Sequence, residues 1–232
     1  MDIRILQLIE GAQQARGLTV VIDVFRAYSL EACLLARGAE KIIPLADEAE
    51  ARRLKAAHPG MLLAGERGGA ILPGFDFGNS PSQALSVPVE GKTVIHTTSA
   101  GTQGISNAVH ADEILGGSLL TARACAEYIR RKNPAEVSLV CMGLATKTPT
   151  EEDTLCAEYI KAILEGDEAR IDMPAEIDNL RRTSGSKFFD PARSEVFPEA
   201  DFHMCVQVDL YPFVVRYVKM PDGCGYMEKV NL

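Results

Sequence analysis

The sequence has no tryptophan, only four histidines and no regular cysteine motif. The histidines lack the i,i+4 spacing of a metal-binding pair and the cysteines lack Cys-x-x-Cys spacing, which argues against a histidine-rich metal site and a zinc finger. The cysteines lie in apolar segments, which predicts reduced, buried thiols; they are Cys33, Cys125, Cys141, Cys156, Cys205 and Cys224. Any metal is therefore expected to bind through oxygen atoms.

Long hydrophobic runs and basic clusters are also missing. No stretch reaches the ~18 apolar residues of a membrane span, and the N-terminus does not read as a signal peptide, so we expect a cytoplasmic protein without a membrane partner. The chain has 24 Lys and Arg against 32 Asp and Glu, a formal charge of −8. This balance argues against nucleic acid as a partner.

What is present is the composition of a globular protein, with 47% hydrophobic and 24% charged residues in a chain of 232. A chain of this length buries roughly 70% of its unfolded surface without disulfides. No linker of ~10 or more Gly, Ser or Pro residues divides it. We therefore expect a single domain over residues 1–232.

Short β-branched runs alternate with segments of helical periodicity, which predicts a three-layer α/β fold with a largely parallel sheet built from repeated βαβα units. The expected strands span 19–24, 41–45, 61–64, 93–98, 113–115 and 137–142. The expected helices span 28–37, 47–57, 102–109, 120–131 and 150–164.

The βαβα order occurs twice, at an offset of about 74 residues. An internal duplication with halves at about 1–90 and 91–170 is one explanation, and the general likeness of any two βαβα units is the other. In the remaining extension, 171–232, we expect an exposed helix at 175–182. Strands at 204–210 and 214–218 are expected to form an antiparallel edge.

Ligands of open α/β sheets bind beyond the carboxyl ends of the strands. Asp23 stands at such an end, where a carboxylate in an apolar run needs a partner. A metal ion or Arg26 could be that partner, and the alternatives are a structural Asp23–Arg26 ion pair or a turn cap. Glu66 and Arg67 follow another strand and precede two glycines, and a surface salt-bridged turn is the alternative there.

Two further turns carry polar residues. The turn 97–102 enters a helix, whose N-terminus could receive a phosphate, although a simple helix cap explains it too. Thr150 and Asp153 fit a capping box. Asp153 and Glu152 could instead lie near Asp23 and supply the oxygen ligands that Mg²⁺ prefers.

Together these segments resemble the 2-phosphosulfolactate phosphatases, Mg²⁺-dependent acid phosphatases associated with coenzyme M biosynthesis. The matching stretches are VIDVFRA (21–27), GAEKIIPLADEAEA (38–51), LAGERGGAILPGFDFGNSP (63–81), GKTVIHTTSAGT (91–102), GGSLL (116–120) and EEDTLCAEYI (151–160). The resemblance runs from about residue 18 to 165, with a fainter echo at 197–201 and 205–209.

The resemblance implies hydrolysis of a phosphate monoester on a small acidic metabolite, with 2-phosphosulfolactate as the leading candidate. It implies that Mg²⁺ is held by Asp23, Glu152 and Asp153, and that Glu66 orients or deprotonates a water. Arg26, Arg67 and the turn 97–102 would hold the phosphoryl oxygens. The substrate-binding candidates are Asn79, Thr97, Thr98, Ser99, Gly101, Thr102 and Gln103.

Three positions depart from the family pattern, which commonly has Thr, Arg and Asn where this chain has Tyr28, Gln103 and Thr121. Arg and Asn side chains are suited to binding anionic oxygens, so their replacement bears on how the sulfonate and carboxylate of the substrate are bound. Direct attack by water is expected, because Phe25 replaces the second Asp of the Asp-x-Asp arrangement that suits an aspartyl-phosphate on Asp23. The alternative functions are a non-catalytic binder or sensor of phosphorylated acids and a phosphatase for another phosphorylated hydroxy acid. A homo-oligomer is a possible assembly in each case.

Overall fold

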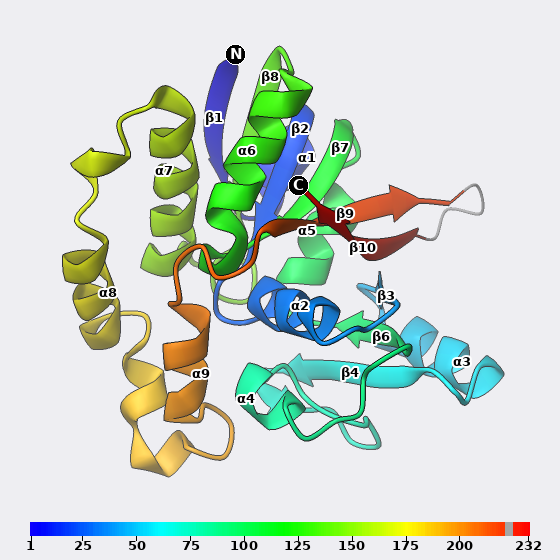
Figure 1. Cartoon of the computed structure of the whole chain (residues 1–232). Helices are drawn as coiled ribbons and strands as arrows, with labels where there is room; N and C mark the ends of the chain where they lie inside the picture. Colours follow the sequence, from blue (N-terminus) through cyan, green and yellow to red (C-terminus); the bar gives the residue numbers. More distant parts are fainter. Residues whose placement is uncertain (221–224) are drawn as a thin grey trace.

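The computed structural model describes residues 1–220 and 225–232. Its described strands form one mixed sheet, and helices cover both faces, which gives the predicted three-layer α/β fold (Figure 1). The strands are β1 (Asp2–Gln7), β2 (Gly17–Ile22), β3 (Lys41–Pro44), β4 (Leu62–Arg67), β5 (Ala70–Ile71), β6 (Thr93–Thr97), β7 (Ala111–Gly117), β8 (Glu136–Cys141), β9 (Phe213–Lys219) and β10 (Gly225–Asn231).

The helices follow the strands in the predicted alternation. They are α1 (Leu8–Gln14), α2 (Ala27–Ala36), α3 (Glu48–Ala57), α4 (Pro81–Ala84), α5 (Gly101–Asn107), α6 (Ala122–Lys132), α7 (Glu151–Glu165), α8 (Met173–Arg182) and α9 (Glu199–Cys205). Every strand and helix expected up to residue 182 is present, with ends shifted by a few residues. β1, α1, β5 and α4 were not expected, because each is short or carries mixed polar and apolar residues.

The sheet order is β1-β8-β2-β7-β9-β10-β3-β6-β4-β5. The strands from β1 to β7 in this order are parallel, as are β3, β6 and β4. The antiparallel pair β9–β10 comes from the C-terminal part of the chain, and within the sheet it joins these two parallel groups. In Figure 1, β4 and β6 lie across the direction of β2 and β8, so the two groups are strongly turned relative to each other.

The core is divided by the sheet. β2 is buried along its whole length and sends alternate side chains to opposite faces, as the pleat of a strand requires. Val21 packs in the cluster with α1, α2 and α5, whereas Val20 and Ile22 pack in the cluster with α6 and α7. Burial on both faces explains why β2 reads as a continuous apolar run.

The strand predicted at 204–210 is wrong. Residues up to Cys205 belong to α9, and the following residues form a turn in which Asp209 has a positive φ of 57°. The buried side chains of Phe202, Cys205 and Val206 have the i, i+3, i+4 spacing of a helix face. β9 pairs antiparallel with β7 and with β10, and the sequence prediction missed β10.

The strand order has the symmetry that an internal duplication would produce. Exchanging β2 with β6, β3 with β7, β4 with β8 and β9 with β10 reverses the order of the eight central strands. The exchanged pairs before β9 are those that the offset of about 74 residues superposes. The duplication stays a prediction, and this arrangement supports it.

Five cysteines are free and buried, in agreement with the predicted thiols: Cys33, Cys125, Cys141, Cys156 and Cys205. Cys224 lies outside the described residues. Across residues 1–220 and 225–232, no helix has the length and apolar character needed to span a membrane.

Candidate active site

A cleft of about 190 Å³ lies where the carboxyl ends of β2, β4, β6 and β8 meet. Larger hollows of about 660 and 690 Å³ lie elsewhere on the surface, but this cleft stands at the position where α/β sheets bind ligands and gathers buried charges. Its lining is Asp23, Phe25, Arg26, Glu66, Gly68, Gly69, Asn79, Ser99, Ala100, Gly143, Leu144, Ala145, Glu152, Asp153, Lys187, Arg193 and Phe197.

Asp23 follows the last residue of β2 and is only 7% exposed. Its Oδ1 accepts a hydrogen bond of 3.1 Å from the backbone N–H of Ala27, at the start of α2, so the turn-cap alternative is present here. Burial, together with the nearby negative charges of Glu66 and Glu152, raises the pKa of Asp23 from 3.8 to about 6. A cation would relieve this penalty.

Gly101 allows the two helices α2 and α5 to start side by side. A Cβ at this position would lie 2.7 Å from the Cβ of Ala27 and 3.0 Å from Oδ2 of Asp23. The carbonyl of Gly101 also accepts a hydrogen bond of 2.9 Å from the hydroxyl of Tyr28. Gly101 therefore permits close packing beside Asp23.

Asp153 joins two loops of the cleft. Its Oδ1 accepts from the N–H of Val24 and its Oδ2 from the N–H of Gly143, both at 2.8 Å. Burial and the charges of Glu152 and Asp23 raise its pKa. The capping-box interpretation is wrong, because the described residues offer the Thr150 hydroxyl no hydrogen-bond partner and the Asp153 carboxylate faces the cleft loops instead.

Glu152 carries an unsatisfied oxygen. The residue is 3% exposed, and its Oε2 has no hydrogen-bond partner among the described residues. Buried polar atoms are normally paired, so this oxygen is available to a ligand. Asp23 lines the same cleft, and the described residues form no hydrogen bond with its Oδ2. Carboxylate oxygens of this kind are ligands that could hold Mg²⁺.

A complete metal cage of protein side chains is not formed. The described residues contain no group of three or more His, Cys, Asp and Glu side chains arranged to hold an ion. Mg²⁺ is usually held by one or two carboxylates together with waters and substrate phosphate. The pair formed by Asp23 and Glu152 therefore fits the ion, whereas both oxygens of Asp153 already bind backbone N–H groups.

Glu66 also acts on two loops at once. Its Oε2 accepts from the N–H of Gly69 and its Oε1 from the N–H of Ser99, both at 2.7 Å. This geometry favours a positioning role for Glu66 over the role of base that the resemblance implied. Gly69, with φ of 88°, lies so close to Phe197 that a Cβ would be 2.3 Å from the ring.

Arg26 pairs with Asp201 and not with Asp23. Its Nη1 lies 2.7 Å from Oδ2 of Asp201 and also donates to the carbonyl of Val196, while Nη2 donates to the carbonyl of Gly69. Both charged side chains are buried. Arg26 lines the cleft, but its hydrogen bonds go to Asp201 of α9, to Val196 before α9 and to Gly69 in the β4–β5 turn.

The residues of the turn 97–102 mostly satisfy each other. The hydroxyl of Thr98 accepts from the N–H of Thr102, and the hydroxyl of Thr102 accepts from the N–H of Thr98, both at 3.2 Å. The hydroxyl of Thr98 thus binds an N–H in the first turn of α5, although the N-cap residue itself, Ala100, forms no side-chain cap. Of the turn, Ser99 and Ala100 line the cleft.

Two other candidates, Arg67 and Gln103, do not line the cleft. Arg67 donates to the hydroxyl of Thr97 at 3.2 Å and to the carbonyl of Glu66. Gln103 donates to the carbonyl of Ala46. Gln103 thus lies outside the cleft, and so do the two other departures from the family pattern, Tyr28 and Thr121.

Asn79 lines the cleft from a buried polar chain that the sequence reasoning missed. Its Oδ1 lies 3.2 Å from Nε2 of His96, whose Nδ1 lies 2.8 Å from Oε1 of Glu31. All three residues are buried. Glu31 and His96 therefore hold the amide of Asn79 at the cleft, an arrangement without any signal in the spacing of the histidines.

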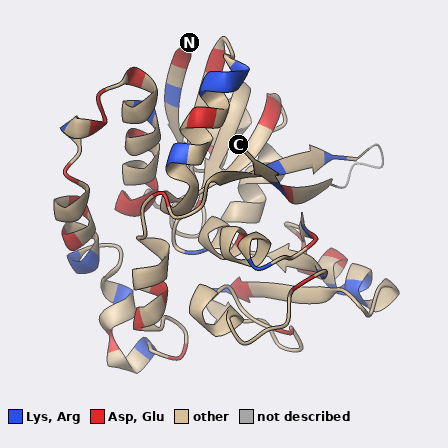
Figure 2. Cartoon of the chain, in the orientation of Figure 1, with Lys and Arg blue, Asp and Glu red and all other residues tan. Residues whose placement is uncertain are grey.

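The sequence reasoning also missed two positive groups of the cleft, which come from the segment between α8 and α9. Lys187 and Arg193 line the cleft beside Phe197, and Figure 2 shows Lys and Arg positions along this segment. The ammonium of Lys187 lies 5.5–5.6 Å from the ring centroids of Phe25, Phe188 and Phe197. Burial lowers its pKa, although the charge of Glu152 opposes this.

Fold and site together define an α/β protein with an acidic cleft at the strand ends. The chain belongs to the 2-phosphosulpholactate phosphatase family, whose family model matches residues 3–220. A probable 2-phosphosulfolactate phosphatase of Caldicellulosiruptor saccharolyticus is 43% identical over 60% of this chain and 59% of its own length. Proteins with the same description from Pseudothermotoga lettingae and Bacillus subtilis are 34% and 28% identical, over 94% and 99% of this chain and 96% and 99% of their own lengths.

The raised pKa of Asp23 makes its ionised form destabilising. Between pH 3.8 and about 6 the folded chain keeps a proton that the unfolded chain releases, so stability falls as the pH rises through this window. We expect Asp23→Asn, in metal-free buffer, to raise the free energy of unfolding by about 1–3 kcal/mol near pH 8 and by little near pH 4. Urea unfolding at both pH values measures this.

The matched control is Asp112→Asn, which replaces an exposed carboxylate on β7. It should change stability little at either pH. If Asp23→Asn destabilised the protein equally at both pH values, the carboxylate of Asp23 would be a structural cap only.

Removing the charge of Asp201 leaves Arg26 buried without a counterion. We expect Asp201→Asn to lower the free energy of unfolding by about 3–5 kcal/mol, and Arg26→Met in the same chain to restore part of it. Glu48→Gln, in the exposed pair with Arg52, should cost less than about 1 kcal/mol. Equal losses for the buried and exposed pairs in urea unfolding would show that Arg26 does not depend on Asp201.

Proposed function

We propose that the chain hydrolyses the phosphate monoester of a small acidic metabolite, with 2-phosphosulfolactate as the substrate and Mg²⁺ as the cofactor. The observation that carries the proposal is the buried pair of carboxylates, Asp23 and Glu152, which share a cleft with cationic side chains; Oε2 of Glu152 has no hydrogen-bond partner among the described residues. A protein that only binds phosphate gains nothing from added negative charge. The family and its named relatives support the same activity.

Glu152, through Oε2, and Asp23, through Oδ2, would hold the Mg²⁺. When bound, the ion neutralises charge on the phosphoryl group and lowers the pKa of a water. The chain itself supplies position and charge, which are the main requirements of phosphoryl transfer. Glu66 and Asp153 hold the loops at the strand ends, and Lys187 donates an N–H to a phosphoryl oxygen.

The attacking group in this proposal is water. Oδ1 of Asp23 is engaged by the N–H of Ala27, and its Oδ2 is the free donor that the ion needs. With Oδ1 engaged by this N–H and Oδ2 by the ion, neither oxygen of Asp23 is left to attack phosphorus, which favours direct attack by water over an aspartyl-phosphate. The second candidate, a non-catalytic sensor of phosphorylated acids, would bind the same ligands without releasing phosphate.

Phosphate release from 2-phosphosulfolactate should cease in EDTA and return with Mg²⁺, because two carboxylates cannot accept a dianionic phosphate without a cation. Glu152→Gln should lower activity by at least about 10–100-fold. The adjacent Glu151→Gln, at an exposed position of α7, is the matched control and should leave activity unchanged. Full turnover in metal-free buffer would contradict the carboxylate model, and tight binding without phosphate release would favour the sensor.

A further inference from the structure

The cleft has two walls of opposite charge. The acidic wall consists of Asp23, Glu66, Glu152 and Asp153, which stand at the strand ends. The basic wall consists of Lys187 and Arg193 with Phe197 between them, and it belongs to the segment between α8 and α9. A substrate in this cleft therefore meets both carboxylates and cations.

Arg193 is held over the cleft without a polar partner. Its guanidinium carbon lies 4.5 Å from the ring centroid of Phe197, which restricts the side chain by stacking. The residue is exposed, and its guanidinium forms no hydrogen bond or ion pair with the rest of the described chain. All of its donors are open to a ligand.

Three cations surround the ring of Phe197, and only one is neutralised. The guanidinium of Arg26 lies 4.8 Å and the ammonium of Lys187 5.6 Å from the ring centroid. Arg26 is paired with Asp201, whereas Lys187 and Arg193 have no carboxylate bonded to them in the described structure. Like charges around one ring repel each other, and a bound anion relieves that repulsion.

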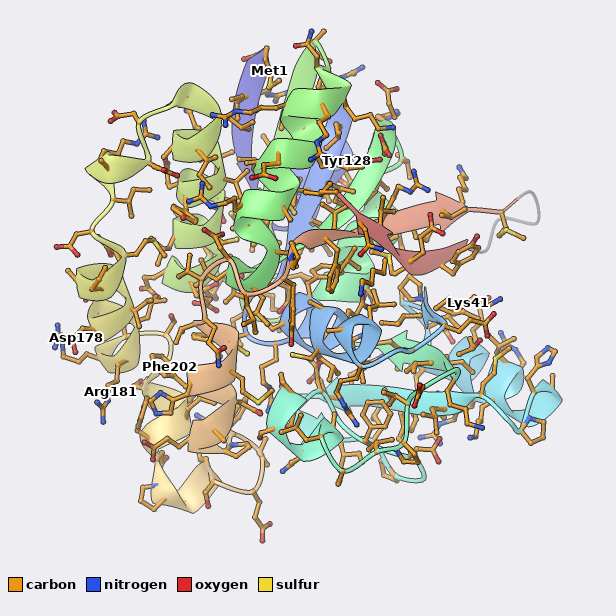
Figure 3. All side chains as sticks on the ribbon, viewed as in Figure 1. Met1, Lys41, Tyr128, Asp178, Arg181 and Phe202 are labelled. Atoms are coloured by element: carbon orange, nitrogen blue, oxygen red, sulfur yellow. The ribbon has the colours of Figure 1, made fainter. Side chains whose placement is uncertain are left out.

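Stacking on a phenyl ring alone does not indicate a ligand site. Arg181 lies at the same distance of 4.5 Å over Phe189. Figure 3 shows it projecting outward at the end of α8, and it is not part of the cleft lining. What distinguishes Arg193 is its place in the cleft lining and its sharing of one ring with Lys187. Arg181 is therefore a natural control for Arg193.

We propose that Arg193 determines substrate specificity by binding a second anionic group, a carboxylate or sulfonate, on a phosphomonoester held deeper in the cleft. The inference rests on the proposed phosphatase function. The planar fork of a guanidinium matches such oxyanions with paired N–H donors. The sequence connected Tyr28, Gln103 and Thr121 with the acid end of the substrate, but none of them lines the cleft. Another residue must therefore bind that end, and Arg193 is placed to do so.

The test compares kcat/KM with Mg²⁺ for three phosphomonoesters in the wild type, Arg193→Gln, Arg193→Lys and Arg181→Gln. The substrates are 2-phosphosulfolactate, 2-phospholactate, which lacks the sulfonate, and isopropyl phosphate, which lacks both acid groups. Arg193→Gln should lower kcat/KM about 10–100-fold for 2-phosphosulfolactate, mainly through KM, and by less than about twofold for isopropyl phosphate. Arg193→Lys should recover part of the lost kcat/KM for 2-phosphosulfolactate. Arg181→Gln should leave kcat/KM unchanged for both of these substrates.

The 2-phospholactate arm identifies the group that Arg193 binds. If Arg193→Gln lowers kcat/KM for 2-phospholactate as much as for 2-phosphosulfolactate, Arg193 binds the carboxylate. If kcat/KM for 2-phospholactate is unchanged, Arg193 binds the sulfonate. A similar fall for isopropyl phosphate would overturn the proposal, because Arg193 would then serve the phosphoryl group or the fold. No fall for any substrate would overturn it as well.

Binding of the product separates this inference from the phosphatase proposal. If the wild type releases no phosphate from any of the three substrates, the proposed function fails. Calorimetric titration of sulfolactate, with and without Mg²⁺, still tests Arg193 in that case. Weaker binding to Arg193→Gln than to the wild type and to Arg181→Gln supports the inference, and equal or absent binding in all three overturns it.

Discussion

The site depends on buried carboxylates that bind backbone N–H groups of different loops. Asp153 joins the loop after β2 to the loop after β8, and Glu66 joins the β4–β5 turn to the loop before α5. Such charge-assisted hydrogen bonds are stronger than neutral ones, so they fix loops from both parallel groups of the sheet around one cleft. These carboxylates also concentrate negative charge at the strand ends, and burying that charge is unfavourable unless a bound cation compensates it.

The composition of the acidic wall could be predicted from the sequence. Parallel strands end at one edge of the sheet, so Asp23, Glu66, Glu152 and Asp153 had to meet once their strands were recognised. The strands were recognisable because β2, β6 and nearly all of β8 are buried, so their sequences are short runs rich in β-branched and apolar residues. The function of each carboxylate was not predictable, since a clamp and a metal ligand have the same residue type and position along the chain.

The remaining parts of the site depend on contacts that leave no local pattern. Arg26 and Asp201 are 175 residues apart, and no periodicity indicates that an ion pair will join them. Lys187 stands in a segment of short turns with no regular hydrophobic spacing. At 204–210 the apolar residues alternate along the sequence as in a strand, but the residues that are buried follow a helical spacing. Gln103 was a candidate only by analogy with a family position, and its side chain bonds the carbonyl of Ala46 instead.

The two walls of the cleft come from different parts of the chain. The acidic wall comes from the repeated βαβα units, in which the offset of about 74 residues places Thr97 at the end of β6 where Asp23 stands after β2. A duplication would thus have kept a carboxylate in one copy and a hydroxyl in the other. The basic wall comes from the segment between α8 and α9, which lies beside the ion pair of Arg26 with Asp201 of α9 and supplies none of the carboxylates of the acidic wall. Substitution of Arg193 can therefore change which anion is bound without disturbing the carboxylate pair at the strand ends.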